Sequence, residues 1–376
     1  MKQRTKAFQL AFILVLSSIT FSCQKSMKEE GPASLRPAGD NDIAPKELKN
    51  FVQLNLVGNN TSDKPLHIDA DLVNAWGISF PPSGPARVSS EGKGVTTIYN
   101  RDGVSVASAV NIPFAGISGK GHPTGLIYNP SSDFKLPNGN PAEFIFATSD
   151  GTISGWNGGS VAVKKIDRSP DASYLGIAAA NSGSDFFLYV ANFAQNRIDV
   201  FDKNWNMVTN KPFVDPDIPA GYSPFNIEII SDSKLFVMYA KKDATGKREV
   251  GPGNGYINVF STGGILLKRF ASKGKLNAPW GITVAPAGFW DQSGLTQIIN
   301  VILVGNNGDG HINAFDENGN SLGPISTNGK AIEIDGLWGI TFPPITGLNP
   351  YNLYFAAGPG NGSNGLVGFV KNRFLN

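Results

Sequence analysis

Histidine is the side chain best suited to proton transfer near neutral pH, and the chain contains three histidines. His122 lies in the motif Gly121-His122-Pro123-Thr124-Gly125, directly before a segment that is predicted to form a strand. It is the candidate general base, with the alternative that backbone hydrogen bonds merely fix the ring in place. His67 and His311 lie in a variable segment and after a glycine-rich turn, and neither shows an acidic neighbour at a useful spacing.

Other kinds of site chemistry find little support. The sequence has no nucleophile elbow, phosphate-binding loop, paired-cysteine motif or His-Glu zinc motif, so hydrolysis by a serine or cysteine nucleophile is disfavoured. The formal net charge is only +2, and no run of Lys or Arg is interleaved with aromatic residues. A nucleic-acid partner is therefore not expected.

The only cysteine, Cys23, follows what we interpret as an export signal. Three basic residues open the chain, and Ala7–Phe21 is apolar but too short and too polar to span a membrane. Ser22 followed by Cys23 resembles the cleavage and lipidation box of bacterial lipoproteins. The resemblance implies a signal peptide over residues 1–22, a lipid on Cys23 that anchors the chain to a membrane, and an outer-membrane lipoprotein of the bacterial cell envelope, periplasmic or surface-exposed. The alternative is an ordinary signal peptide with Cys23 as a bystander.

The elements that must position these residues are predicted by composition and by a repeat. Residues 23–50 are polar and are expected to form a flexible tether. Beyond them, 44 glycines, 25 prolines and a charged fraction of 16% in the 376-residue chain favour a turn-rich, all-β fold. A short segment, in which a glycine precedes an aliphatic residue, recurs about every 50 residues, which is the spacing of four-stranded propeller blades. The six copies are centred on Gly77, Gly125, Gly176, Asn226, Gly281 and Gly339.

The repeat predicts a six-bladed β-propeller over residues 51–376, in which the recurring segment is the innermost strand of each blade. The last copy ends after three strands, whereas Phe51–Val57 is one additional strand at the start. We therefore predict that this N-terminal strand closes the last blade and removes two open sheet edges. Asn226 replaces glycine in the fourth copy, which favours a positive φ at the repeated position.

In such a ring, the loops that enter the innermost strands share one face with the turns between the second and third strands. Polar residues at these places should converge on the channel mouth. The predicted ligand-binding residues are Asn74, His122, Asp150, Asn192, Lys241, Asn306 and Asp335, and Ser173, Ser223, Asn277 and Asp309 lie at similar places. The side-chain oxygens of Asn192, Asn306, Asp309 and Asp335 suit a hard cation such as Ca²⁺. The alternative is that these Asn and Asp residues form turns by bonding their own backbone.

Three tryptophans occupy equivalent places in the repeat. Trp76, Trp280 and Trp338 begin the recurring segment in the first, fifth and sixth copies. We interpret them as core residues at the junctions between blades. If they instead face the channel mouth, their rings could stack on a sugar.

Several motifs together resemble a known family. Phe51–Val57, Asp71–Gly77, Gly121–Gly125 and the repeated Trp-Gly-Ile segments are similar to those of functionally uncharacterised, exported bacterial six-bladed propeller proteins related to NHL-repeat propellers. The resemblance covers nearly the whole mature chain and implies the fold but no reaction. More distantly similar six-bladed propellers include calcium-dependent lactonases, amidating lyases and binding scaffolds, among which the fold does not choose.

Two classes of function follow. The first is a monomeric cell-envelope lipoprotein whose propeller is a binding scaffold for a carbohydrate, peptide or protein ligand. The second is a metal-assisted, Ca²⁺-dependent enzyme, similar to a lactonase or lyase, with its site at the channel mouth and His122 as its catalytic residue. A bare spacer is disfavoured by long loops such as Lys242–Gly255.

Overall fold

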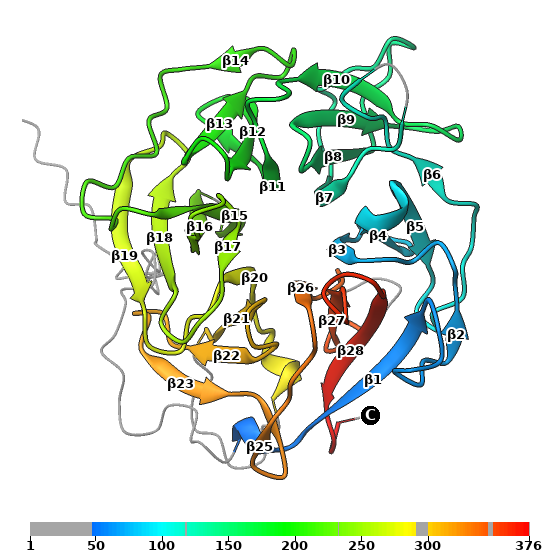
Figure 1. Ribbon diagram of the computed structural model, residues 1–376, viewed down its shortest axis with the longest axis vertical. Coiled ribbons are helices and arrows are strands. Elements are labelled where there is room, and N and C mark those ends of the chain that lie inside the picture. The colour runs from blue at the N-terminus through cyan, green and yellow to red at the C-terminus, as the bar shows by residue number, and fades with distance from the viewer. Residues whose placement is uncertain (1–46, 117–118, 232, 291–299, 345–348, 376) are drawn as a thin grey trace, which may run out of the picture. The chain divides into compact units, whose positions relative to one another are not determined.

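The computed structural model describes residues 47–116, 119–231, 233–290, 300–344 and 349–375. In these ranges six sheets follow one another around a central axis (Figure 1), and one further two-stranded hairpin is present. The remaining regular elements of the described chain are three short 3₁₀ turns: η1 (Glu47–Lys49), η2 (Glu91–Lys93) and η3 (Ala287–Phe289). The predicted all-β, six-bladed propeller is confirmed.

The first three blades each have four strands in chain order from the axis outward. Blade 1 is β3 (Ala75–Ser79), β4 (Ala86–Ser90), β5 (Val95–Tyr99) and β6 (Val110–Asn111). Blade 2 is β7 (Pro123–Tyr128), β8 (Phe144–Thr148), β9 (Thr152–Trp156) and β10 (Val163–Asp167). Blade 3 is β11 (Tyr174–Ser182), β12 (Asp185–Asn192), β13 (Arg197–Phe201) and β14 (Met207–Val208).

Blades 4 and 5 follow the same order with local additions. Blade 4 is β15 (Tyr222–Ser231), β16 (Lys234–Lys242), β18 (Gly255–Ser261) and β19 (Leu266–Ser272), with the short β17 (Arg248–Glu249) paired to β16. Blade 5 is β20 (Pro279–Val284), β21 (Ile302–Asn306), β22 (Ile312–Phe315) and β23 (Ser321–Pro324). The separate hairpin is β24 (Ser326–Thr327) and β25 (Lys330–Ala331).

The last blade joins the two ends of the described chain. It consists of β26 (Leu337–Thr341), β27 (Leu353–Ala357), β28 (Leu366–Asn372), β1 (Phe51–Gly58) and β2 (His67–Ile68). The N-terminal strand β1 runs antiparallel to β28 with Phe51 opposite Asn372 and Gly58 opposite Leu366 (Figure 1). The predicted closure of the ring by the N-terminal strand is therefore confirmed.

The repeated glycines have a different purpose from the one predicted. None of the six repeated positions has a positive φ. Instead, neighbouring innermost strands approach closely at these positions: a Cβ on Gly281 would lie 2.7 Å from the carbonyl oxygen of Trp338 and 2.9 Å from the backbone nitrogen of Ile340. Glycine is thus required for the close approach of one backbone to the next, rather than for backbone freedom.

Asn226 fits the same scheme by a different means. Its side chain occupies the space beside Gly176 of the preceding innermost strand, where a Cβ on that glycine would collide with Oδ1. Its Nδ2 donates a 2.8 Å hydrogen bond to the carbonyl oxygen of Trp280 in the next innermost strand. Asn226 therefore links the innermost strands of blades 3, 4 and 5, and the prediction of a positive φ was wrong.

Aromatic residues at the starts of the innermost strands meet on the axis. Trp76 and Trp338 stack with ring centroids 3.5 Å apart, and Trp280 packs edge-on against both. Leu175, Phe193 and Phe225 belong to the same buried cluster. The three tryptophans are buried as expected, but they pack on one another across the ring and not at separate blade junctions. We call this group the axial cluster.

Candidate functional site

His122 forms the best defined polar contact at the channel mouth. It lies directly before β7, and its Nδ1 is 2.9 Å from Oε1 of Glu91 in the turn η2 of blade 1. The His122 side chain is 47% exposed and that of Glu91 is 21% exposed. A carboxylate on one ring nitrogen fixes the orientation of an imidazole and leaves the other nitrogen, Nε2, available for a ligand.

Glu91 is itself held by a hydrogen-bond chain that starts in the axial cluster. Trp338 Nε1 donates to Oδ1 of Asn74 at 3.3 Å, and Asn74 Nδ2 donates to Oε2 of Glu91 at 2.8 Å. Asn74 has a φ of 50°, a left-handed conformation that asparagine adopts more readily than most residues. The chain from Trp338 through Asn74 and Glu91 to His122 therefore connects blade 6 to blades 1 and 2.

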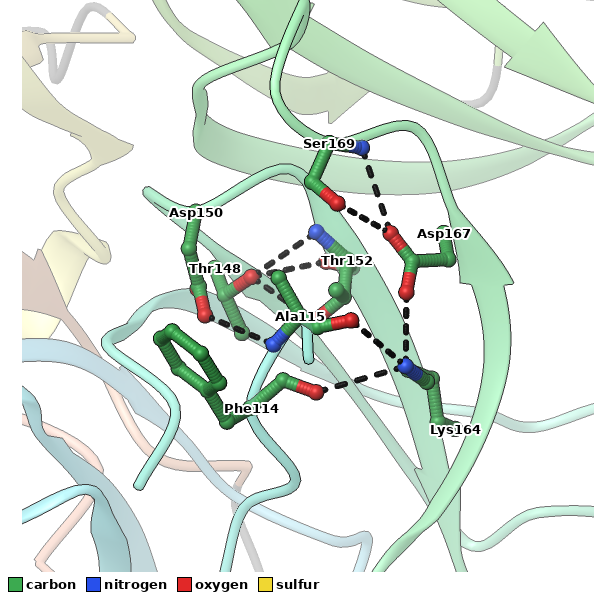
Figure 2. A network of polar contacts seen from close by, with 8 residues as sticks. All are labelled: Phe114, Ala115, Thr148, Asp150, Thr152, Lys164, Asp167 and Ser169. Atoms are coloured by element: carbon green, nitrogen blue, oxygen red, sulfur yellow. Dashed lines mark hydrogen bonds and ion pairs between the residues drawn. The ribbon is translucent and has the colours of Figure 1, made fainter. Parts of the chain in front are cut away.

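Asp150 holds the loop that carries His122. One carboxylate oxygen accepts the backbone N–H of Ala115 at 3.2 Å (Figure 2), and the other accepts the backbone N–H of His122 at 3.4 Å. Both ends of this loop are thus tied to the turn between β8 and β9. Asp150 converges on the site as predicted by position, but it acts here on the backbone of its neighbours.

Lys164 reinforces the same loop from the outer strand β10. Its Nζ donates to the carbonyl oxygens of Phe114 and Ala115 and forms a 2.6 Å ion pair with Asp167 (Figure 2). Burial opposes ionisation of Asp167, but hydrogen bonds from Lys164 and Ser169 prevail and lower its pKa. The carboxylate stays ionised near neutral pH and keeps the lysine in position.

Arg248 brings a positive charge to the axis at the same end of the ring. It lies on β17, and its guanidinium carbon is 5.1 Å from the ring centroid of Trp338. The residue is exposed and has no ion pair with any carboxylate of the described chain, and partial desolvation of the guanidinium lowers its pKa while leaving it cationic near neutral pH. Such a guanidinium is suited to bidentate contact with a carboxylate.

Lys241 supports the strand that carries Arg248. It forms a 2.7 Å ion pair with Glu249, which follows Arg248 on β17. Both side chains are about 40% exposed, so the pair adds little to stability but helps to define where β17 lies against β16. Lys241, predicted as a ligand-binding residue, thus acts in this structure through Glu249.

The other predicted residues are engaged within their own blades. Asn192 and Asn306 are fully buried, and their Oδ1 atoms accept the backbone N–H groups of Ser173 and Asn277, respectively. Ser90 Oγ accepts the N–H of Val73 at the equivalent place in blade 1. The end of the second strand therefore carries a polar side chain that holds the loop entering the innermost strand, in agreement with the turn-forming alternative.

The remaining polar residues of the two predicted sets have local partners too. Asp309 accepts the Nδ2 groups of Asn277 and Asn306 at 3.3 and 3.4 Å and the backbone N–H of His311. Asp335 accepts the backbone N–H of Gly360. Ser223 donates its hydroxyl to the carbonyl oxygen of Phe193. The structure brings together Asn74, His122 and Asp150. Asp309, Asp335 and Ser223 form their contacts elsewhere.

The predicted Ca²⁺ donors do not fit a ready-made cation site. The described residues include no group of three or more His, Cys, Asp or Glu side chains that could hold a metal ion. Ca²⁺ requires six to eight oxygen ligands, whereas the oxygens of Asn192 and Asn306 already accept backbone N–H groups. Ca²⁺ binding stays a prediction, and no step proposed below depends on it.

Comparison with known proteins establishes the family of the chain. Two uncharacterised proteins of Acanthamoeba polyphaga mimivirus are each 33% identical to it. One alignment covers 88% of this chain and 82% of the relative, and the other covers 89% and 90%. The chain belongs to their family. These relatives are viral, so the bacterial and exported character expected from the sequence stays a prediction. No protein-family model matches the chain.

Solved structures support the propeller architecture. A streptogramin B lyase is similar with a TM-score of 0.50 and 14% identity, covering 86% of this chain and 98% of the other. A protein of unknown function from Bacteroides thetaiotaomicron is similar with a TM-score of 0.52 and 10% identity, covering 86% and 76%. At these identities the likeness shows the fold alone. In the described part of this propeller, none of the helical segments has the length and apolar character needed to cross a membrane.

Glu91 and Arg248 are the functional candidates that the sequence prediction lacks. Glu91 lies in the turn between the second and third strands of blade 1, where Asp150 and Asp309 lie in blades 2 and 5, so the same rule applied to blade 1 indicates it. Arg248 has no comparable signal beyond its place in a long loop. The structure also shows His311 Nδ1 3.7 Å from Asp309 Oδ1, an acidic neighbour that the sequence prediction discounts.

Proposed function

We propose that the channel mouth binds a carboxylate-bearing ligand and that His122 acts on it as a general base, as in a lyase reaction. The 2.9 Å contact between His122 and Glu91 carries this proposal. The carboxylate holds Nδ1 and Asn74 holds the carboxylate, while Nε2 has no hydrogen bond to any described residue and can accept a proton. Trp338, which is buried, in turn donates a hydrogen bond to Asn74, so the contact is supported from the axial cluster.

Arg248 supplies the recognition of the ligand. Its guanidinium lies over the ring of Trp338. The same tryptophan begins the series of hydrogen bonds that leads to His122, so Trp338 contacts the anion site and supports the base. A bidentate contact with a ligand carboxylate would neutralise the uncompensated charge of Arg248. The same contact would stabilise the negative charge that develops on that carboxylate when a neighbouring proton is removed.

The reaction that follows is a β-elimination. His122 Nε2 takes the proton from the carbon next to the carboxylate, and the electron pair of that C–H bond forms a carbon–carbon double bond. The C–O bond at the adjacent carbon breaks, and the leaving oxygen takes a proton from water. The imidazolium then returns its proton to solvent. A streptogramin B lyase has a similar fold, but that likeness supports only the architecture.

An acidic oligosaccharide with oxygen at the β-carbon, oligogalacturonate, is the probe for this reaction. Formation of the double bond is followed by ultraviolet absorbance and proton NMR. We expect His122→Ala to lower the rate by about 10²–10⁴-fold, the usual contribution of a positioned base. Glu91→Gln should lower the rate less, and Glu333→Gln, which changes an exposed carboxylate outside the site, is the matched control. Turnover that survives in His122→Ala would contradict the proposal.

A binding scaffold without chemistry is the second candidate. Arg248, which pairs with no carboxylate of the described residues, favours this candidate as much as it favours the enzyme. Under this proposal the mouth holds the acidic group of a carbohydrate, peptide or protein ligand. Binding of oligogalacturonate that is lost in Arg248→Gln but unchanged in His122→Ala, with no product formed, would select this candidate over the lyase.

We also propose that the chain is a monomeric lipoprotein of the cell envelope, tethered through Cys23. Residues 1–46, including the signal peptide, Cys23 and most of the expected tether, lie outside the described residues. The sequence pattern around Cys23 alone supports this proposal. Incorporation of labelled palmitate into the full chain expressed in a Gram-negative bacterium, lost in Cys23→Ser, is the expected result. An unlabelled chain would contradict it.

A further inference from the structure

A cavity of about 400 Å³ lies at the opposite end of the channel from His122. Its walls are the second halves of the six innermost strands, which surround the axis (Figure 1). Trp280 lines the cavity and also belongs to the axial cluster, so the cluster separates this cavity from the mouth. The volume lies in the range of sites for small ligands.

Most side chains that line this cavity are apolar, and one of the lining residues carries a charge. Ser79, Thr283 and Thr341 add hydroxyl groups to the lining residues. Aliphatic side chains line it from every side, among them Ile78, Leu126, Ile177, Ile282 and Ile340. Glu228 of β15 is the one charged residue among the lining residues. Asn226, two residues before Glu228 on β15, also lines the cavity, and its buried Oδ1 has no hydrogen-bond partner in the described chain.

The surroundings of Glu228 disfavour its charge. Burial raises the pKa of Glu228 to about 8, and a hydrogen bond with the Asn226 side chain opposes part of the rise. The lining residues of the flanking strands β11 and β20 are uncharged, and the opposite residue on β16 is Phe236. No cation of the described chain compensates this carboxyl group.

We propose that this cavity binds a small organic cation, a primary amine on an aliphatic or alicyclic body, with its ammonium group at Glu228. The aliphatic side chains among the lining residues match the body of such a ligand, and the single carboxylate matches its charge. An ammonium offers three N–H donors, which suits a site whose one charged lining residue is a carboxylate. The proposal does not rest on the lyase proposal, because the axial cluster lies between the two sites.

Calorimetric titration of the full chain with cyclohexylamine, and with cyclohexanol as its neutral counterpart, tests this inference. With a pKa of about 8, Glu228 is mostly protonated at pH 7 and mostly ionised at pH 9. We therefore expect the affinity for cyclohexylamine to rise about tenfold between these pH values, because the amine itself remains protonated. At pH 7 binding should release close to one proton, seen as a dependence of the heat on the buffer. Cyclohexanol should bind more weakly and without pH dependence.

Variants of Glu228 decide the outcome. Glu228→Gln should lose both the preference for the amine and its pH dependence, and Glu228→Asp should keep the pH dependence with weaker binding because the carboxylate is withdrawn. Glu333→Gln, an exposed carboxylate outside the cavity, should behave as the unchanged chain. Equal binding of amine and alcohol, preference that persists in Glu228→Gln, or no binding of the amine at pH 9 would each overturn the proposal. Tighter binding of the alcohol at pH 7 would indicate a neutral ligand that accepts a hydrogen bond from protonated Glu228.

Discussion

Polar residues at the end of the second strand stabilise the fold, and in blade 1 the residue that follows belongs to the candidate site. Ser90, Asn192 and Asn306 end the second strands of their blades and accept the backbone N–H of the loop that enters the innermost strand. Because Ser90 holds the loop in blade 1, the side chain of Glu91, the next residue, is available to contact His122. The candidate site residue Glu91 therefore directly follows a residue, Ser90, whose role in the repeat is structural.

Glu228 should leave a measurable mark on stability. Its folded pKa of about 8 lies above the ordinary value of about 4.3, so the folded chain binds more protons than the unfolded chain between these values. The contribution of this group to the free energy of unfolding is at its full value below about pH 4. It declines as the pH rises to about 8. We expect the difference in unfolding free energy between the unchanged chain and Glu228→Gln to shift in favour of the variant across this window. Urea unfolding at pH 5, 6.5 and 8 measures it, and a constant difference would contradict the assignment.

At the scale of the elements, the strands could be predicted and the contacts between loops could not. Each innermost strand carries its own local signature, and the alternation in Phe51–Val57 marks the closing strand. By contrast, the hydrogen bond between Trp338 and Asn74 joins residues 264 positions apart, and the contact of His122 with Glu91 joins different blades. Such contacts depend on how blades sit beside one another, which no local pattern encodes.

The packing of adjacent innermost strands gives a sharp test at Gly281. Gly281→Ala would place a methyl group 2.7 Å from the backbone carbonyl of Trp338, where nothing flexible can move aside. We expect a loss of about 1–3 kcal/mol in the free energy of unfolding. Gly263→Ala is the control, because its nearest atom is the Ser261 hydroxyl oxygen at 3.5 Å. Equal stability of the two variants would refute the close-approach explanation.

For the whole molecule, closure by β1 determines whether the ring is stable. Phe51 and Val57 are fully buried and Leu56 nearly so, and burial of each contributes about 2 kcal/mol. The sum of about 6 kcal/mol rivals the entire stability of many domains. Deletion of residues 51–58 should abolish cooperative thermal unfolding, whereas deletion of residues 24–45 should leave the melting temperature unchanged. Circular dichroism during heating distinguishes these results, and a shortened ring that melts normally would refute closure.

The ring has two chemically different ends separated by the axial cluster. The mouth carries Arg248 and the Glu91–His122 pair, and the opposite end carries the cavity with Glu228. The sequence predicted convergence at the mouth, and the structure brings Asn74, His122 and Asp150 together there. Asn192 and Asn306 instead bond the loops of their own blades, and turn-forming and ligand-binding asparagines look alike in one sequence. The cavity was not indicated by the sequence, since isolated aliphatic residues near a glutamate are common in any strand.

The most direct test of the proposed mouth is an NMR titration of the full chain labelled in histidine. The chain has three histidines, so His67 and His311 are internal references for His122. Oligogalacturonate should shift the ring signals of His122 in a saturable manner, leave the other two unchanged, and lose its effect in Arg248→Gln. Neutral galactose oligomers should have no effect. Signals of His122 that do not respond to the acidic probe, or that respond equally to the neutral one, would contradict the account.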